Sequence, residues 1–146
     1  MEFPKSIGFL LENPTFLDRY SGYQNLKMLA SVKKIISDEE INKVLCLVGL
    51  DEEAAKKKYR KYSLGMKQRL GIAAALMEKP DIVILDEPTN ALDTSGVELV
   101  KEIVRGEKKR GALVIISCHD LAVLEELSDE IIKLESGKVI EHIGRA

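Results

Sequence analysis

Residues 81–93 read DIVILDEPTNALD, and the architecture can be worked out from this stretch. It begins with a short, continuous, β-branched apolar run at 81–85, which is typical of a strand buried on both faces of a parallel sheet. The run ends in two adjacent carboxylates, Asp86 and Glu87, and Pro88 follows them. The stretch therefore predicts a core strand that delivers acidic side chains to one edge of a sheet.

The chain after this strand alternates helices and strands. Asp93 is placed to cap a helix over 94–105, and residues 112–117 form a second apolar run that we expect to be another buried strand. The remaining predicted elements are a short helix capped by Asp120 and ending at Leu127, then strands over 130–134 and 139–143 joined by a turn. This order indicates an α/β unit with parallel strands.

The chain before residue 80 is predicted to be mostly helical. Residues 6–11 read as a strand, and the pattern from 15 to 80 is helical. Ser37 and Glu40 have the spacing of a capping box, and a further helix is predicted over 66–77. A helical block is thus followed by an α/β block, and we expect the two to pack as one unit because no flexible linker separates them.

Polar side chains follow two of the predicted strands. In open α/β sheets ligands bind beyond the carboxyl ends of the strands, where the sequence places Asp86, Glu87 and His119. One carboxylate can hold Mg²⁺ through water while the next orients or deprotonates an attacking water, and a neutral histidine can hydrogen-bond a terminal phosphate. Ser63 and Gly65 immediately precede a predicted helix, and the free N–H groups at a helix N-terminus can bind an anion. Each feature alone also fits a plain loop or cap, but together they predict a nucleotide site.

The composition is that of a single globular domain. Of the 146 residues, 45% are hydrophobic and 32% charged, which excludes disordered, collagen-like and mucin-like chains. The net charge of −2 gives no general attraction to nucleic acid, and the basic run at 56–62 is predicted to be a solvated helix face or connector. Cys46 and Cys118 make no disulfide framework, so we expect a reducing, intracellular compartment.

Residues 62–93 carry a family resemblance. They read YSLGMKQRLGIAAALMEKPDIVILDEPTNALD and resemble the region from the signature motif to the D-loop of ATP-binding-cassette (ABC) ATPases. Residues 7–14, IGFLLENP, resemble the Q-loop, and residues 115–120, IISCHD, resemble the switch-histidine segment. The resemblance covers nearly the whole chain, with four ordered motifs at family-like spacing.

The resemblance implies a P-loop NTPase fold of which this chain holds the C-terminal part. Residues 1–13 would be the Q-loop strand and loop of the core, and residues 14–80 the helical signature subdomain. Residues 81–146 would be the C-terminal part of the RecA-like parallel sheet, with the N-terminal lobe missing.

The resemblance also implies roles for single residues. Asp86 would hold Mg²⁺ through water as the Walker B aspartate, Glu87 would be the general base, and His119 would sense the γ-phosphate of ATP. Ser63 and Gly65 would contact the γ-phosphate of an ATP held by the opposing subunit of a head-to-tail dimer.

Two more motif positions come with departures from the family pattern. Asp93 would belong to the D-loop at the dimer interface, and Glu12 occupies the Q-loop position, indirectly near Mg²⁺, where Gln is commonest. In the signature, Tyr62, Leu64 and Met66 replace the usual Leu, Gly and Gln. Both departures resemble bacterial exporter ATPases for bacitracin- and lantibiotic-type peptides.

The implied partners are a second ATPase subunit and a transmembrane permease, with no nucleic acid. The complete protein would couple ATP hydrolysis to membrane transport, at the cytoplasmic face of the cell membrane. Residues 15–30, with Phe16, Tyr20 and Tyr23, are the candidate contact with the permease, although these aromatics fit a core equally well. The cargo and the direction of transport reside in the permease.

One family motif does not occur in the sequence. There is no G-x-x-x-x-G-K-S/T loop, and the only G-x₄-G, residues 106–111, is predicted to be a charged connector. Without that nest of N–H groups and its lysine, the phosphates of ATP lose their main holder. We therefore expect the isolated chain to bind MgATP weakly or not at all, to lack ATPase activity, and to self-associate through uncovered sheet edges and faces.

Two other interpretations remain open. The chain could be a truncated, non-catalytic module that contributes its signature residues in trans to another subunit's ATP site. It could also be the C-terminal lobe of a split chromosome-maintenance ATPase head. Those heads carry long coiled coils between Q-loop and signature, whereas no sustained heptads lie between Glu12 and Ser63.

Overall fold

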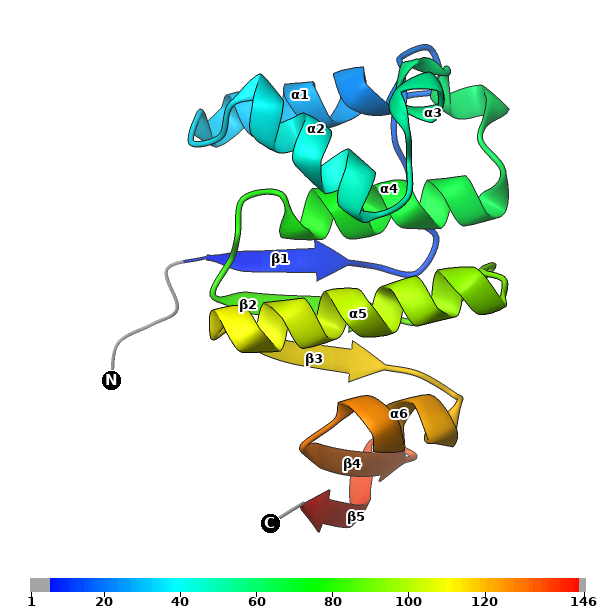
Figure 1. The fold of residues 1–146 in the computed structure, drawn as a ribbon. Helices are drawn as coiled ribbons and strands as arrows, with labels where there is room; N and C mark the ends of the chain where they lie inside the picture. Colours follow the sequence, from blue (N-terminus) through cyan, green and yellow to red (C-terminus); the bar gives the residue numbers. More distant parts are fainter. Residues whose placement is uncertain (1–5, 145–146) are drawn as a thin grey trace.

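A helical layer lies against one face of a parallel sheet (Figure 1). The protein is described by a computed structural model, which covers residues 6–144; residues 1–5 of the predicted first segment fall outside this range. The elements are β1 (Ile7–Leu10), α1 (Gly22–Lys33), α2 (Asp38–Leu47), α3 (Glu52–Lys56), a 3₁₀ turn (Tyr59–Lys61), α4 (Leu64–Leu76), β2 (Ile82–Asp86), α5 (Thr94–Arg110), β3 (Leu113–Ser117), α6 (Leu121–Leu127), β4 (Glu130–Glu135) and β5 (Lys138–Gly144). The predicted α/β fold with a parallel sheet is confirmed.

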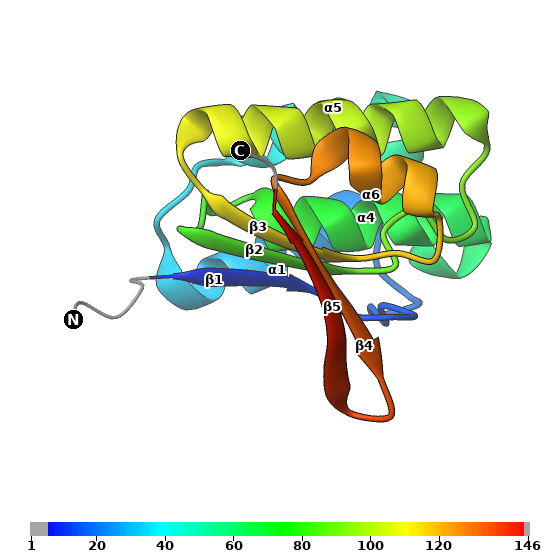
Figure 2. The same cartoon turned by 90° about the horizontal axis from the view of Figure 1, so that it is seen from below.

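The sheet contains β1, β2 and β3 in that order, all parallel. Its register places Phe9, Ile84 and Ile115 in one row across the three strands. Strands β4 and β5 form a separate antiparallel hairpin, which projects away from the sheet (Figure 2). Among the described residues, no helix is long and apolar enough to cross a membrane.

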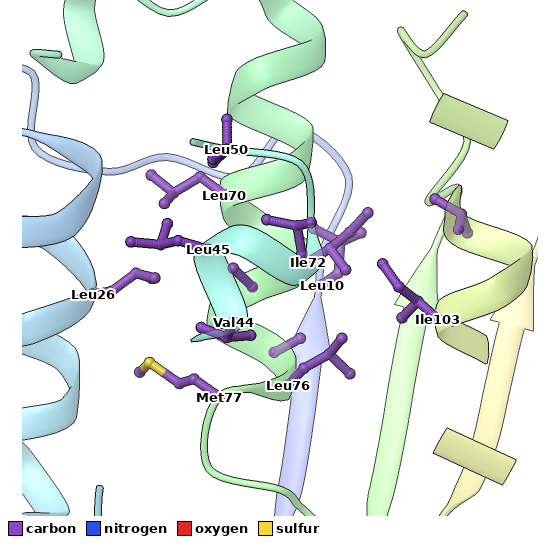
Figure 3. Packing of buried hydrophobic residues seen from close by; sticks show 14 of the residues in the cluster. Leu10, Leu26, Val44, Leu45, Leu50, Leu70, Ile72, Leu76, Met77 and Ile103 are labelled. Carbon is purple, nitrogen blue, oxygen red and sulfur yellow. The ribbon is translucent and has the colours of Figure 1, made fainter. Parts of the chain in front are cut away.

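Helix α4 lies between the helical layer and the sheet and is buried on several sides. Leu70 and Ile72 are at most 1% exposed. Leu26 and Leu45 reach α4 from α1 and α2, and Leu10 reaches it from β1 (Figure 3). From Leu70 to Leu76 the helix is apolar and lies in the core, so it joins the two blocks into one packed unit.

The helices begin at polar side chains, though not always as the spacing suggests. The Ser37 hydroxyl accepts the Glu40 N–H at 3.3 Å, so α2 has the predicted N-cap. The full capping box is found in α1, where Ser21 and Gln24 each satisfy the other's backbone N–H. Residues 106–111 form the last turn of α5 and not a connector, because the helix continues to Arg110 and ends at Gly111 with φ +96°.

The sheet is covered on one face only, so the expectation of strands buried on both faces is wrong for the described residues. Helices α4 and α5 lie on the same side of the sheet (Figure 2). On the opposite face Ile7, Phe9, Leu113 and Ile115 are 44 to 56% exposed. The β-branched runs are as apolar as predicted, but no helix of residues 6–144 packs on this second face.

Candidate functional site

Strands β2 and β3 end at the same edge of the sheet and bring three predicted residues together. Asp86 is opposite Ser117 in the register, and His119 lies two residues beyond Ser117. The His119 Nε2 atom is 3.0 Å from Glu87 Oε1. The His119 side chain is 96% exposed whereas that of Glu87 is 16% exposed, so the histidine lies on the solvent side of the carboxylate.

The backbone of Glu87 is held in a strained conformation. Its φ is +49°, in the left-handed region that residues with a side chain rarely occupy. Its N–H donates to the Ser117 carbonyl at 3.0 Å and lies 3.1 Å from the Ser117 hydroxyl oxygen. Its carbonyl accepts the Asn90 N–H at 3.1 Å and the Gln68 side-chain amide at 2.9 Å. These hydrogen bonds offset the strain and fix the backbone position from which the Glu87 side chain extends.

Ser117 also holds the neighbouring carboxylate. Its hydroxyl donates to Asp86 Oδ1 at 2.5 Å, so a single oxygen connects the Asp86 side chain with the Glu87 backbone. The sequence interpretation missed both Ser117 and Gln68. A hydroxyl at the end of an otherwise apolar strand, in register with Asp86, was the available signal for Ser117.

The N-terminus of α4 lies against the loop that follows β2. Ser63 is the N-cap residue of α4, and its hydroxyl accepts the Met66 N–H at 3.2 Å. A Cβ atom at Gly65 would lie 3.1 Å from the carbonyl oxygen of Ala91, so the helix start and the loop approach closely. The helix N-terminus and its serine have the geometry of an anion-binding end.

A cavity of about 510 Å³ lies between the predicted Q-loop, α4 and the loop after β2. Glu12 and Glu87 both line it, together with Lys67 and Gln68 from α4. Two carboxylates from segments far apart in the sequence thus face one space, as expected for a shared site at the edge of a parallel sheet.

Asp93 has a structural task in this chain. Its carboxylate accepts the Gly96 N–H at 2.9 Å and the Ser95 hydroxyl at 3.0 Å, which caps α5. These hydrogen bonds, the Gly96 N–H first, lower the pKa of the Asp93 carboxyl below its ordinary value. A contribution of Asp93 to a dimer interface stays a prediction.

The aromatic residues of the predicted permease contact divide into two groups. Phe16 and Tyr23 are partly buried against the core, and Phe16 packs edge-on to Tyr59 with ring centroids 5.5 Å apart. Tyr20 is 43% exposed and is the most accessible of the three to solvent.

The carboxylates of the edge suit a metal held partly by other ligands. Within residues 6–144, no three His, Cys, Asp or Glu side chains are grouped so that they could hold a metal ion by themselves. Mg²⁺ usually takes one or two protein carboxylates and completes its shell with water and phosphate oxygens. Asp86 and Glu87 fit that role, whereas the printed sequence offers no loop for the phosphates.

Comparison with known proteins finds sequence relatives over most of the chain. Residues 1–90 match the family model described as "ABC transporter". One curated relative is the uncharacterized ABC transporter ATP-binding protein YybJ of Bacillus subtilis (strain 168), which is 47% identical to this chain. Two others are the bacitracin transport ATP-binding protein BcrA of Enterococcus faecalis, at 38% identity, and the lantibiotic transport ATP-binding protein SrtF of Streptococcus pyogenes, at 39%. The alignments cover 95, 94 and 93% of this chain and 63, 45 and 58% of those proteins. The chain thus spans about half to two thirds of the relatives' length.

A solved structure has the same fold. It is a dimeric, post-hydrolysis state of the ATP-binding cassette MJ0796 bound to ADP and Pi, with a TM-score of 0.87 and 25% identity. The match covers 95% of this chain and 62% of that one. These findings confirm the predicted resemblance, including the likeness to bacitracin and lantibiotic transport proteins.

Proposed function

The chain belongs to the ABC transporter ATPase family, and from this premise we propose that it supplies the Walker B, switch and signature residues of an ATP-hydrolysing transporter subunit. The observation that carries the proposal is the edge of the sheet where Glu87 contacts His119 and Asp86 contacts Ser117. Adjacent carboxylates and a histidine at this place suit the hydrolysis of a phosphate anhydride.

Each residue of the edge has a distinct task in this proposal. Asp86 would hold Mg²⁺ through water, and the metal would neutralise the phosphate charge when bound with ATP. Glu87 accepts a proton from the attacking water, and its partly buried side chain keeps the carboxylate oriented. His119 donates a hydrogen bond to the terminal phosphate, and its exposure leaves it free to turn towards the nucleotide. Glu12 lines the same cavity as Glu87 and would lie indirectly near the metal.

The signature residues serve a second ATP. Ser63 and Gly65 at the α4 N-terminus bind the γ-phosphate of a nucleotide held by an opposing subunit, and Asp93 lies at the interface between the two. In this arrangement residues 1–13 are the Q-loop segment of the core, residues 14–80 the signature subdomain and residues 81–146 the rest of the core.

The proposed partner of the ATPase dimer is a transmembrane permease. Its contact is residues 15–30, where Tyr20 is exposed beside the cavity-lining residues Thr15 and Asp18. Binding to the permease places the complex at the inner face of the cell membrane. The names of the relatives make a peptide antibiotic the first cargo to examine.

A specific observation favours a second function, contribution in trans. The signature end of α4 is fully formed, while the printed sequence has no phosphate-binding loop of its own. A chain of this kind can complete the ATP site of another subunit without holding ATP itself.

Calorimetry and a mixing experiment test both functions. Titration of the 146-residue chain with MgATP is expected to show no micromolar binding, and such binding would refute the predicted inactivity of the chain. The chain is then mixed with an ABC ATPase subunit that carries a G-x-x-x-x-G-K-S/T loop and a Glu→Gln change at its own base.

The expected result is an ATP-dependent heterodimer in size-exclusion chromatography with light scattering. Ser63→Arg should abolish this heterodimer, because the larger side chain blocks the anion site at the α4 N-terminus. Ser31→Arg, an exposed serine on α1, is the matched control and should leave it intact. A heterodimer that forms without ATP and also forms with Ser63→Arg would contradict the proposed role of the signature residues.

A further inference from the structure

Gln68 is an unusual residue for its place in the fold. It lies within α4, whose other buried residues are all apolar or glycine, and it is 7% exposed. Burying an amide without a partner costs free energy, so a buried glutamine is expected to make a specific hydrogen bond. Its Nε2 donates to the carbonyl oxygen of Glu87 at 2.9 Å, across 19 residues of sequence.

The hydrogen bond joins two different layers of the molecule. The N–H of Glu87 is held by β3 through Ser117, whereas its carbonyl is held by α4 through Gln68. The strained φ of +49° persists only where such contacts hold the backbone from several sides. The 510 Å³ cavity borders both Gln68 and Glu87, so on that side no packed atoms restrain the turn.

We propose that Gln68 is a positioning residue that couples the position of helix α4 to the position of the Glu87 carboxylate. The role of Glu87 as base rests on the proposed function, but the coupling itself does not. Helix α4 also carries Ser63 and Gly65, so a displacement of its N-terminus by an anion reaches Glu87 through Gln68. The helix proposed to bind the nucleotide of the opposing subunit therefore adjusts the position of Glu87, the proposed base for the nucleotide of its own subunit.

Nuclear magnetic resonance of the isolated chain at one fixed pH tests the coupling without nucleotide. Gln68→Met keeps the length of the side chain and removes the donor. The ring signals of His119 report on Glu87, because the two side chains are 3.0 Å apart. His142 pairs with Glu130 at the same distance in the β4–β5 hairpin and serves as an internal reference.

The matched control is Gln24→Met, which removes another glutamine side chain whose oxygen accepts the Ser21 N–H at 2.9 Å. We expect Gln68→Met to shift the His119 signals and to speed hydrogen exchange of the Asn90 amide by about fivefold, since the turn loses one hydrogen bond. The His142 signals should not shift in Gln68→Met, and Gln24→Met should shift the signals of neither histidine.

Two results would overturn the coupling. One is a folded Gln68→Met protein with unchanged His119 signals; the other is an equal His119 shift in both variants, which would indicate general loosening. Should Gln68→Met fail to fold, the wild-type protein decides: its Gln68 side-chain amide protons must exchange clearly more slowly than those of exposed Gln24. Because no ATP is present, failure of the mixing experiment leaves this result unaffected.

Discussion

Tyr62 shows at the scale of one residue how this chain adapts the family signature. It stands where the pattern has leucine, and its side chain is 6% exposed. The hydroxyl finds a partner in the carbonyl of Ala54, at 2.6 Å. Burial, the main cause, raises the pKa of the Tyr62 hydroxyl from 10.0 to about 12. The larger side chain therefore fits as a core residue only in its neutral form.

Tyr62→Phe is expected to lower the free energy of unfolding by about 1 kcal/mol at neutral pH, because the Ala54 carbonyl loses its donor. Above pH 10 the unfolded chain ionises Tyr62 before the folded one does, so wild-type stability falls as the pH rises from 10.0 to about 12. Tyr62→Phe should remove part of this alkaline loss. Urea unfolding at neutral and alkaline pH measures both effects.

Tyr20→Phe is the control, since Tyr20 is 43% exposed and its change should be nearly neutral. Equal alkaline slopes for wild-type and Tyr62→Phe would contradict the burial of an un-ionised hydroxyl.

At the scale of elements, the fold depends on how closely α4 lies against β1. A Cβ atom at Gly8 would stand 1.9 Å from the carbonyl oxygen of Ala75, and one at Gly71 would stand 2.6 Å from Leu10 Cδ1. Gly8 lets the backbones of β1 and α4 approach each other directly, and Gly71 leaves room for the side chain of Leu10 against α4.

Gly8→Ala should lower the free energy of unfolding by about 3 kcal/mol or more, because the added methyl meets main-chain atoms that cannot rotate away. Gly106→Ala is the matched change in α5, where a Cβ atom would have nothing within 4 Å. It should stabilise the protein by about 0.5–1 kcal/mol through helix propensity. Chemical denaturation of both variants checks the contrast, and comparable effects would refute the close contact of α4 and β1.

At the scale of the whole molecule, the open face of the sheet is the largest departure from a complete α/β layer structure. Parallel sheets are normally covered on both sides. Here Phe9, Leu113 and Ile115 leave an apolar face in contact with water, and the outer edges of β1 and β3 carry no further strand among the described residues. Exposed apolar surface of this kind promotes association.

The 146-residue chain is therefore expected to self-associate as its concentration rises. Phe9→Lys places a charge on the open face at edge strand β1, where Phe9 is 53% exposed, and should shift the protein towards monomer. Val32→Lys, on α1 and 81% exposed, is the control and should not. Light scattering across a concentration series is the measurement, and a clean monomer for the wild-type protein at high concentration would contradict the expectation.

Most elements were predictable because the local signals in the sequence agree with the tertiary fold. The β2 run, the Asp93 and Asp120 caps and the closing hairpin all appear close to their predicted bounds. The predicted end of α5 at residue 105, with a charged connector over 106–111, is wrong, because the amphipathic pattern continues to Arg110 and the cap is at Gly111. A glycine inside a helix costs only about 1 kcal/mol, which packing readily offsets.

The meeting of Asp86, Glu87 and His119 was predictable because strand ends of a parallel sheet lie at one edge. Gln68 and Ser117 were not, because a hydrogen bond between distant segments leaves no periodic trace in the sequence.

The sequence by itself determined the α/β order of elements, the motif residues and the family. Tertiary structure alone decided that Glu87 occupies a strained conformation held from α4 and β3, and that one face of the sheet is open. The physical reason is range. Helix caps and hydrophobic periods act between near neighbours in the chain, whereas burial and cross-strand bonds depend on which distant segments come to lie against each other.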